Sequence, residues 1–203
     1  EAIANHNCGF YYEQNTDNFS KIPGSPLAYW ASEQVYELFK NAPLSKYVAF
    51  KEGITTGDND RFLRLWHEVD SNNISIQNAT NGRWKPCNKG GSFRRWYGNR
   101  DYVIDWKDNG QYLKKFKGSS FRNADFQLLE GGTYSNLSSG AFSARYSEAG
   151  TAFESKGTTF FSSSLSKALA YMNTSLFNYL LKFVCPTLDY KFGTIQKLPY
   201  LLG

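Results

Sequence analysis

The sequence has few of the residues that active sites and metal centres use most often. Of its 203 residues, three are cysteine, two are histidine and one is methionine. Cys8, Cys87 and Cys185 lie far apart and form no CxxC pair, and His6 and His67 are isolated, so the ligand cluster of a zinc site is missing. The scarcity of cysteine favours a reduced, cytoplasmic protein without a disulfide framework.

Other absences narrow the chemistry further. No apolar run approaches membrane-spanning length and no signal peptide is present, so we expect no membrane partner. The sequence contains no GxSxG, no GxxxxGK[ST] and no GxG, which argues against a hydrolase nucleophile elbow, a nucleotide P-loop and a glycine loop for S-adenosylmethionine. Asn-Pro-Pro-Tyr, which would clamp a flipped adenine, is absent as well. Because the chain starts at Glu1 and its only methionine is Met172, we expect it to be a piece of a longer protein.

The most informative segment that is present runs from residue 89 to residue 100, KGGSFRRWYGNR. Four cations, three aromatic rings and three glycines fall within these twelve residues. Fixed positive charge neutralises phosphates, and arginine is the commonest side chain for bidentate contact with guanine. The formal net charge of +5 permits a polyanionic partner without requiring one. The alternative is a solvated basic loop whose aromatic rings plug into a core.

Two short patterns match half of a metal-dependent nuclease site. Residues 154–156 and 105–107 each read acid-x-Lys, and Asp101 or Asp125 would have to complete the metal coordination. Such tripeptides often arise by chance. The turn-rich residues 53–60, GITTGDND, could hold a phosphate on backbone N–H groups or be a plain turn.

The periodicity of apolar residues predicts an α+β fold. Ser25-Pro26 is typical of a helix start and predicts a helix ending near Asn41, and a long helix is expected over residues 164–184. Strict strand–helix alternation is missing, which favours a mixed or antiparallel sheet of short strands. The strands are expected at residues 47–51, 62–69, 102–106, 142–146, 152–154, 158–161 and 192–199, and the buried face of the long helix at Leu169, Met172, Leu176 and Leu180.

Several blocks of sequence resemble, in order, one family. Residues 19–30, FSKIPGSPLAYW, resemble the segment that follows the catalytic domain in PglX-type adenine-specific DNA methyltransferases of BREX phage-defence systems. Residues 53–62 are similar to the start of their target-recognition region. Later blocks with a resemblance are WKPCNKGGSFRRWYG at 84–98 and LSSGAFSARY at 137–146, and residues 155–158 and 186–199 resemble the end of TaqI-like specificity domains.

The resemblance implies a division of labour in a restriction-modification or BREX methyltransferase. A domain outside these residues would bind S-adenosylmethionine and methylate adenine N6, and this fragment would hold no cofactor. Residues 1–43 would form the connecting arm and helix after that domain, and residues 44–203 a target-recognition domain with a TaqI-like fold. The partners would be double-stranded DNA and the methyltransferase domain, in the bacterial cytoplasm.

The residue types agree with DNA recognition. Arg94 or Arg95 fits guanine N7 and O6, and Asn88 or Asn99 fits adenine N6 and N7. Arg61 beside the glycine–threonine turn fits a phosphate. The expected DNA-contacting set is Arg61, Lys85, Asn88, Lys89, Arg94, Arg95, Asn99, Arg100 and Lys156, with Trp96 and Tyr97 anchoring the loop to the core.

Two functions from other classes compete with DNA recognition. An aromatic-rich carbohydrate- or protein-binding module would show an exposed Trp/Tyr platform without surrounding basic charge. Part of a fused restriction endonuclease would cleave DNA in a magnesium-dependent manner. Salt dependence separates the first from DNA binding, because DNA affinity falls steeply with salt and sugar affinity does not.

The absent glycine loop and adenine clamp predict that the chain on its own does not bind S-adenosylmethionine or methylate DNA. Titration calorimetry with the cofactor is expected to give no saturable heat. Saturable binding in the micromolar range would contradict the prediction.

Overall fold

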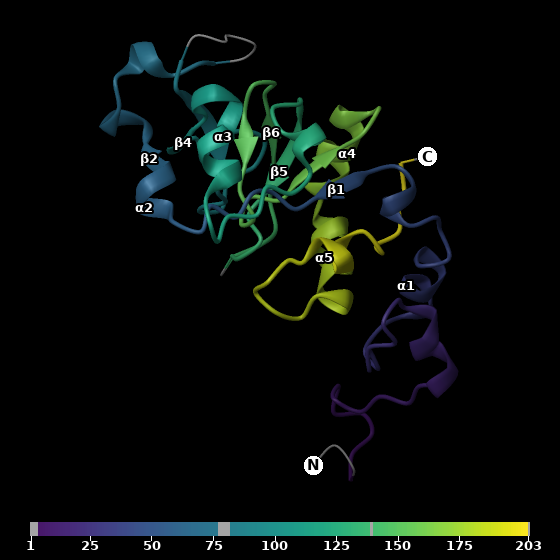
Figure 1. Cartoon of the computed structure of the whole chain (residues 1–203). Coiled ribbons are helices and arrows are strands. Elements are labelled where there is room, and N and C mark those ends of the chain that lie inside the picture. Colours follow the sequence, from purple (N-terminus) through teal and green to yellow (C-terminus); the bar gives the residue numbers. More distant parts are fainter. Residues whose placement is uncertain (1–3, 77–81, 139, 203) are drawn as a thin grey trace.

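The computed structural model describes residues 4–76, 82–138 and 140–202, so the first three residues of the predicted arm lie outside the described part. The fold is α+β, as predicted (Figure 1). Its strands form two four-stranded sheets. The first sheet is antiparallel, in the order β1 (Ala49–Lys51), β8 (Thr159–Phe161), β5 (Gly131–Tyr134), β6 (Ala144–Ser147).

The second sheet is mixed. Its order is β2 (Leu63–Leu65), β4 (Tyr102–Asp105), β3 (Trp84–Asn88), β7 (Ala152–Phe153). Strand β7 runs parallel to β3, and the other pairs are antiparallel. Since β6 and β8 belong to the first sheet, the chain crosses to the second sheet for two residues and returns.

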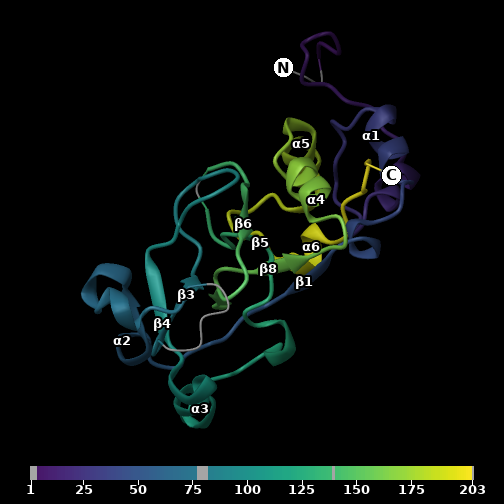
Figure 2. The same ribbon diagram turned by 90° about the horizontal axis from the view of Figure 1, so that it is seen from above.

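Helices lie at both ends of this pair of sheets. They are α1 (Glu33–Leu38), α2 (Asn59–Phe62), α3 (Lys107–Lys115), α4 (Leu165–Met172), α5 (Ser175–Val184) and α6 (Phe192–Ile195). Short 3-10 helices occur at Thr16–Lys21, Leu44–Lys46, Trp66–Glu68, Ser71–Asn73 and Ala124–Phe126. Figure 2 shows α2 and α3 at one end, α4, α5 and α1 at the other, and the first sheet between them. None of the helices among the described residues is long and apolar enough to cross a membrane.

Two apolar clusters follow this division. The larger one joins the first sheet to α1, α4 and α5, and it includes Ile22, Ala28 and Tyr36 from the N-terminal segment. The smaller one lies at the second sheet and includes Phe62 and Leu113. The predicted domain boundary at residue 43 stays a prediction, although residues on both sides of it share the larger cluster.

The predicted long helix over 164–184 is two helices, because Asn173 and Thr174 interrupt it. The buried amide of Asn173 donates to the carbonyl of Ala144 at 2.9 Å and accepts from its N–H at 3.0 Å, which fastens the chain to β6. The hydroxyl of Thr174 accepts from Phe177 N–H at 3.0 Å and starts a new helix. This restart changes the buried face: Leu176 is 40% exposed, so its predicted burial is wrong, while Leu169, Met172 and Leu180 are buried as expected.

Three other predicted elements differ from the structure in their bounds or their type. The first helix begins at Glu33, because Ser25 adopts a left-handed backbone (φ 47°) instead of the extended conformation of a helix-capping residue. Residues 192–195 form a helical turn where an extended strand was expected. The predicted strand over 62–69 ends at Leu65 and continues as a 3-10 helix.

The exposed Leu176 and the buried Leu180 of α5 provide a matched pair of positions for testing the packing. Leu180→Asp should lower the free energy of unfolding by several kcal/mol, on the order of 4, because it buries an unpaired charge. Leu176→Asp, the same change four residues earlier, should have a far smaller effect. Urea unfolding of both variants checks this, and equal losses would contradict the arrangement of α5.

Candidate nucleic-acid interface

The basic segment forms a surface loop, here named the arginine loop (residues 89–101), that links β3 to β4. Its two ends are held together because Cys87 and Tyr102 are paired across these strands. Gly90, Gly91 and Gly98 all have positive φ angles (87°, 118° and 128°), which residues with a side chain rarely adopt. The glycines therefore shape the loop as a compact turn.

The arginine loop is bonded to the other sheet. Trp96 N–H donates to Ala144 O at 3.0 Å, and Tyr146 N–H donates to Trp96 O at 2.8 Å, so the loop runs parallel alongside β6. The Asn99 amide donates to Ser92 O at 2.8 Å and closes the loop internally. These bonds fasten the loop backbone to β6 and close the loop on itself.

The side chains at the tip of the loop point into solvent. Arg94 and Arg95 are exposed, and the Arg95 guanidinium lies 5.4 Å from the Phe93 ring centroid. Trp96 and Tyr97 are 55% and 57% exposed, so the expectation that they anchor the loop to the core is wrong. The anchoring comes from the Trp96 backbone, and both rings are accessible to a partner.

Beneath the loop lies a buried cation that no sequence pattern singles out. Arg145 on β6 is 1% exposed, and its guanidinium donates to Ser135 Oγ at 3.1 Å, Arg94 O at 3.4 Å and Ser143 Oγ at 3.5 Å. It has no carboxylate partner among the described residues, and its Nε has no hydrogen-bond partner there. Burial, together with the charges of Arg100 and Arg94, lowers the pKa of Arg145 to about 10.

Arg100 is partly neutralised. Its guanidinium lies 3.6 Å from Glu148 and donates to Thr151 Oγ1 at 3.2 Å, with the Tyr97 ring centroid 5.0 Å away. Glu148 also accepts from the Tyr97 hydroxyl at 3.3 Å. Of Arg94, Arg100 and Arg145, only Arg100 pairs with a carboxylate among the described residues, which leaves excess positive charge at the base of the loop.

Three predicted DNA-contacting residues are inside the protein, and their assignment is corrected for this reason. The buried Asn88 amide donates to Ser147 Oγ at 2.7 Å and connects the two sheets. The Asn99 amide is also buried, and its hydrogen bond to Ser92 holds the loop. Lys85 is buried on β3, where burial lowers its pKa. Burial keeps these three side chains away from base edges in this conformation.

The remaining predicted cations are accessible. Lys89 lies with its ammonium group 4.7 Å from the Tyr102 ring centroid, and Lys156 is exposed on the neighbouring turn. That turn is close to the loop, since a Cβ on Gly90 would stand 3.0 Å from Lys156 O. Arg61 is exposed on α2.

The two half-motifs of a nuclease serve local structure. Asp105 accepts from the Arg83 guanidinium at 2.6 and 3.0 Å, and Glu154 accepts from the backbone N–H of Lys156 at 2.9 Å. Within the part of the chain that the structure describes, no three His, Cys, Asp or Glu side chains are grouped so that they could hold a metal ion. In the turn at 53–60, Asp58 accepts from Arg61 N–H at 3.0 Å and caps α2.

The fold and the loop define a class of protein: an α+β chain that presents a cationic, aromatic loop supported by two small sheets. No family model matches the chain. It is 39% identical, over 98% of its length, to the adenine-specific methyltransferase PglX of Lacticaseibacillus casei strain Zhang, and 37% identical, over 91%, to the adenine-specific methyltransferase BrxX of Escherichia coli O9:H4 strain HS.

Over nearly its whole length the chain is thus similar to a segment of the adenine-specific methyltransferases PglX and BrxX, the resemblance that its sequence blocks predicted. It spans 18% of the length of the first relative and 16% of the second.

Replacing Arg145 by Met tests whether this cation contributes to stability. A buried guanidinium without a carboxylate gains little for the fold, so the stability of Arg145→Met should lie within about 1 kcal/mol of wild type or above it. Arg83→Met is the control, because it leaves the buried Asp105 carboxylate unpaired and should destabilise. Denaturant unfolding measures both. A loss of stability in Arg145→Met larger than in Arg83→Met would show that Arg145 is a structural residue.

Proposed function

We propose that the chain selects the DNA sequence for an N6-adenine DNA methyltransferase by binding double-stranded DNA. The observation that carries this proposal is the arginine loop, in which exposed Arg94 and Arg95 stand over the buried Arg145. Phosphates would supply negative charge to a loop in which, among the described residues, Arg100 alone pairs with a carboxylate, that of Glu148. The names of the relatives, both adenine-specific methyltransferases, support the proposal.

The fixed backbone of the loop supports specific recognition. A loop that is already hydrogen bonded to β6 loses little conformational entropy when it binds. Arginine presents its donors in a rigid fork that matches guanine N7 and O6, which suits Arg94 or Arg95. Lys89 and Lys156 flank the loop and suit phosphates, which fix the register on the duplex.

We assign the cofactor and the methyl transfer to other parts of the full-length protein. The matched relatives are more than five times as long as the chain, since it covers 18% or less of them. S-adenosylmethionine would bind outside this segment, and the segment would supply the choice of target. The partners that follow are duplex DNA and the methyltransferase domain.

One observation bears on the competing carbohydrate-binding function. Trp96 and Tyr97 form an exposed aromatic pair, which sugar-binding modules use for stacking. Arg94 and Arg95 precede this pair directly and Arg100 lies against the Tyr97 ring, so the platform is surrounded by positive charge. The surrounding charge favours a nucleic acid.

The double variant Arg94→Ala/Arg95→Ala tests the proposal in the full-length protein. The fold should be kept, because exposed cations add little stability. Duplex affinity should fall, and the slope of log affinity against log salt should flatten by about one unit for each phosphate that the variant no longer neutralises. If one arginine contacts guanine, the loss of affinity on the specific site should be larger by about 1–3 kcal/mol than on random DNA.

The control is Lys167→Ala/Lys182→Ala, which removes two exposed cations from α4 and α5 at the far side of the first sheet. Fluorescence anisotropy across a salt series measures the duplex affinity of wild type and of the two double variants. If the arginine variant keeps the affinity and the salt slope of wild type, the loop is not part of the DNA interface. If both double variants lose the same amount of duplex affinity, the loop arginines contribute only non-specific electrostatic attraction.

A further inference from the structure

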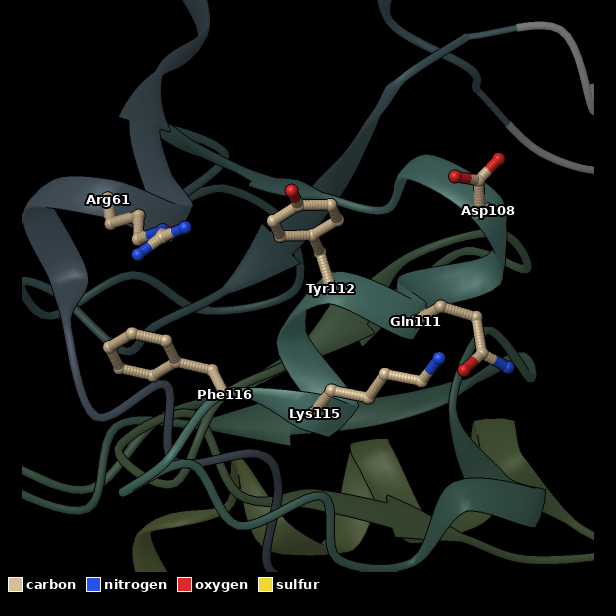
Figure 3. A pocket seen from close by; sticks show the side chains of 6 residues that line it. All are labelled: Arg61, Asp108, Gln111, Tyr112, Lys115 and Phe116. Carbon is tan, nitrogen blue, oxygen red and sulfur yellow. The ribbon is translucent and has the colours of Figure 1, made fainter.

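A concave surface lies at the opposite end of the molecule from α4 and α5. It is a pocket of about 360 Å³ between α2 and α3, lined by Arg61, Asp108, Gln111, Tyr112, Lys115 and Phe116. Figure 3 shows the Arg61 side chain reaching from α2 toward the rings of Tyr112 and Phe116. Two cations and one carboxylate at the rim leave the pocket with a net positive charge.

Aromatic rings hold the guanidinium of Arg61 in place. Its central carbon lies 5.1 Å from the ring centroid of Phe116, 5.6 Å from that of Phe62 and 5.9 Å from that of Tyr112. Among the described residues the guanidinium has no hydrogen bond and no ion pair. Its donors are therefore unused, and the rings restrict the orientation of its plane.

The backbone positions α3 so that its polar face is directed outward. Asp108, Asn109 and Gly110 adopt left-handed φ angles of 52°, 56° and 73° before the regular helical turns begin. Leu113 is fully buried in the smaller apolar cluster, whereas Tyr112 is 61% exposed. Gln111 and Lys115, four residues apart, are exposed on the same face of α3.

We propose that this pocket contacts base edges of double-stranded DNA, with Arg61 pairing with a guanine. The inference rests on the proposed function and adds a second contact region to it. An exposed helix face fits the major groove, and an arginine with an oriented fork pairs with guanine N7 and O6 in a bidentate manner. This assignment differs from the sequence-based expectation that Arg61 contacts a phosphate, and it rests on the position of Arg61 beside the exposed face of α3, because base edges are read by helices that enter the major groove. Lys115 supplies the phosphate contact beside it.

The pocket lies next to the arginine loop. A neighbouring pocket is lined by Asp60 and Arg64 near α2, and also by Lys89 and Tyr102 at the ends of the loop. Helix α2 thus separates the Arg61 pocket from the first residue of the loop. The proposal therefore places the second contact region beside the start of the loop, at Lys89.

The test is Arg61→Lys in the full-length protein, with Arg122→Lys as the matched control. Both changes keep the charge and remove the fork, but the Arg122 guanidinium is engaged by Glu52. Bound sequences are selected from a pool of random duplexes. Arg61→Lys should keep the salt slope of wild type and lose the preference for guanine at one position by about 5- to 150-fold, the range of a bidentate contact. Arg122→Lys should keep every preference.

The outcomes separate the two proposals. If wild type selects a sequence and Arg61→Lys selects the same one, the pocket assignment is wrong and the proposed function stands. If Arg61→Lys weakens binding to all sequences equally, Arg61 is a phosphate contact and the guanine assignment is overturned. If wild-type protein selects no sequence from the pool, target selection itself fails.

Discussion

The two-residue strand β7 holds the two sheets together. Its neighbours in the chain, β6 and β8, belong to the first sheet, while β7 pairs with β3 in the second. Gly53 has no side chain because Phe153 leaves no room for one: an added Cβ would lie 2.1 Å from Phe153 O. The arginine loop starts on β3 and bonds to β6, so its shape depends on this crossing.

The loop also depends on charge placed where water is excluded. Arg145 donates to Arg94 O, which means that the buried cation supports the backbone of an exposed one. A protein gains little stability from a buried cation that lacks a counter-charge. The charge of Arg145 therefore adds to the positive charge beneath the proposed contact surface of the loop.

Local patterns predict five of the eight strands in the described residues and part of β2, miss β3 and β5, and predict the ends of helices poorly. The strands expected near residues 49, 103, 145, 153 and 160 are all present, because their β-branched and aromatic residues are bounded by turns. The break at Asn173 is not predictable from local sequence, because its cause is the backbone of Ala144, distant along the chain. Strand β5 contains two glycines and carries little strand signal, so the sequence does not predict it.

The predictions for the candidate site also succeed where local sequence decides and fail where tertiary contacts decide. Arg94 and Arg95 are exposed as a basic loop requires, but Asn88 and Asn99 have the right chemistry for adenine and are used inside the protein. Whether an amide faces solvent or a neighbouring strand is decided by tertiary contacts, which composition does not contain. Arg145 escapes prediction for the converse reason, since its position under the loop follows only from the register of β6.

The residues that carry the surface chemistry take little part in the two apolar clusters. Arg94 and Arg95 project from a loop whose shape comes from glycines and backbone bonds, and Gln111 projects from the outer face of α3. Side chains at these positions can change size, charge and hydrogen-bonding character while the sheets keep their packing. Residues on the exposed loop and on the outer face of α3 can therefore be substituted without disturbing the two apolar clusters that stabilise the fold.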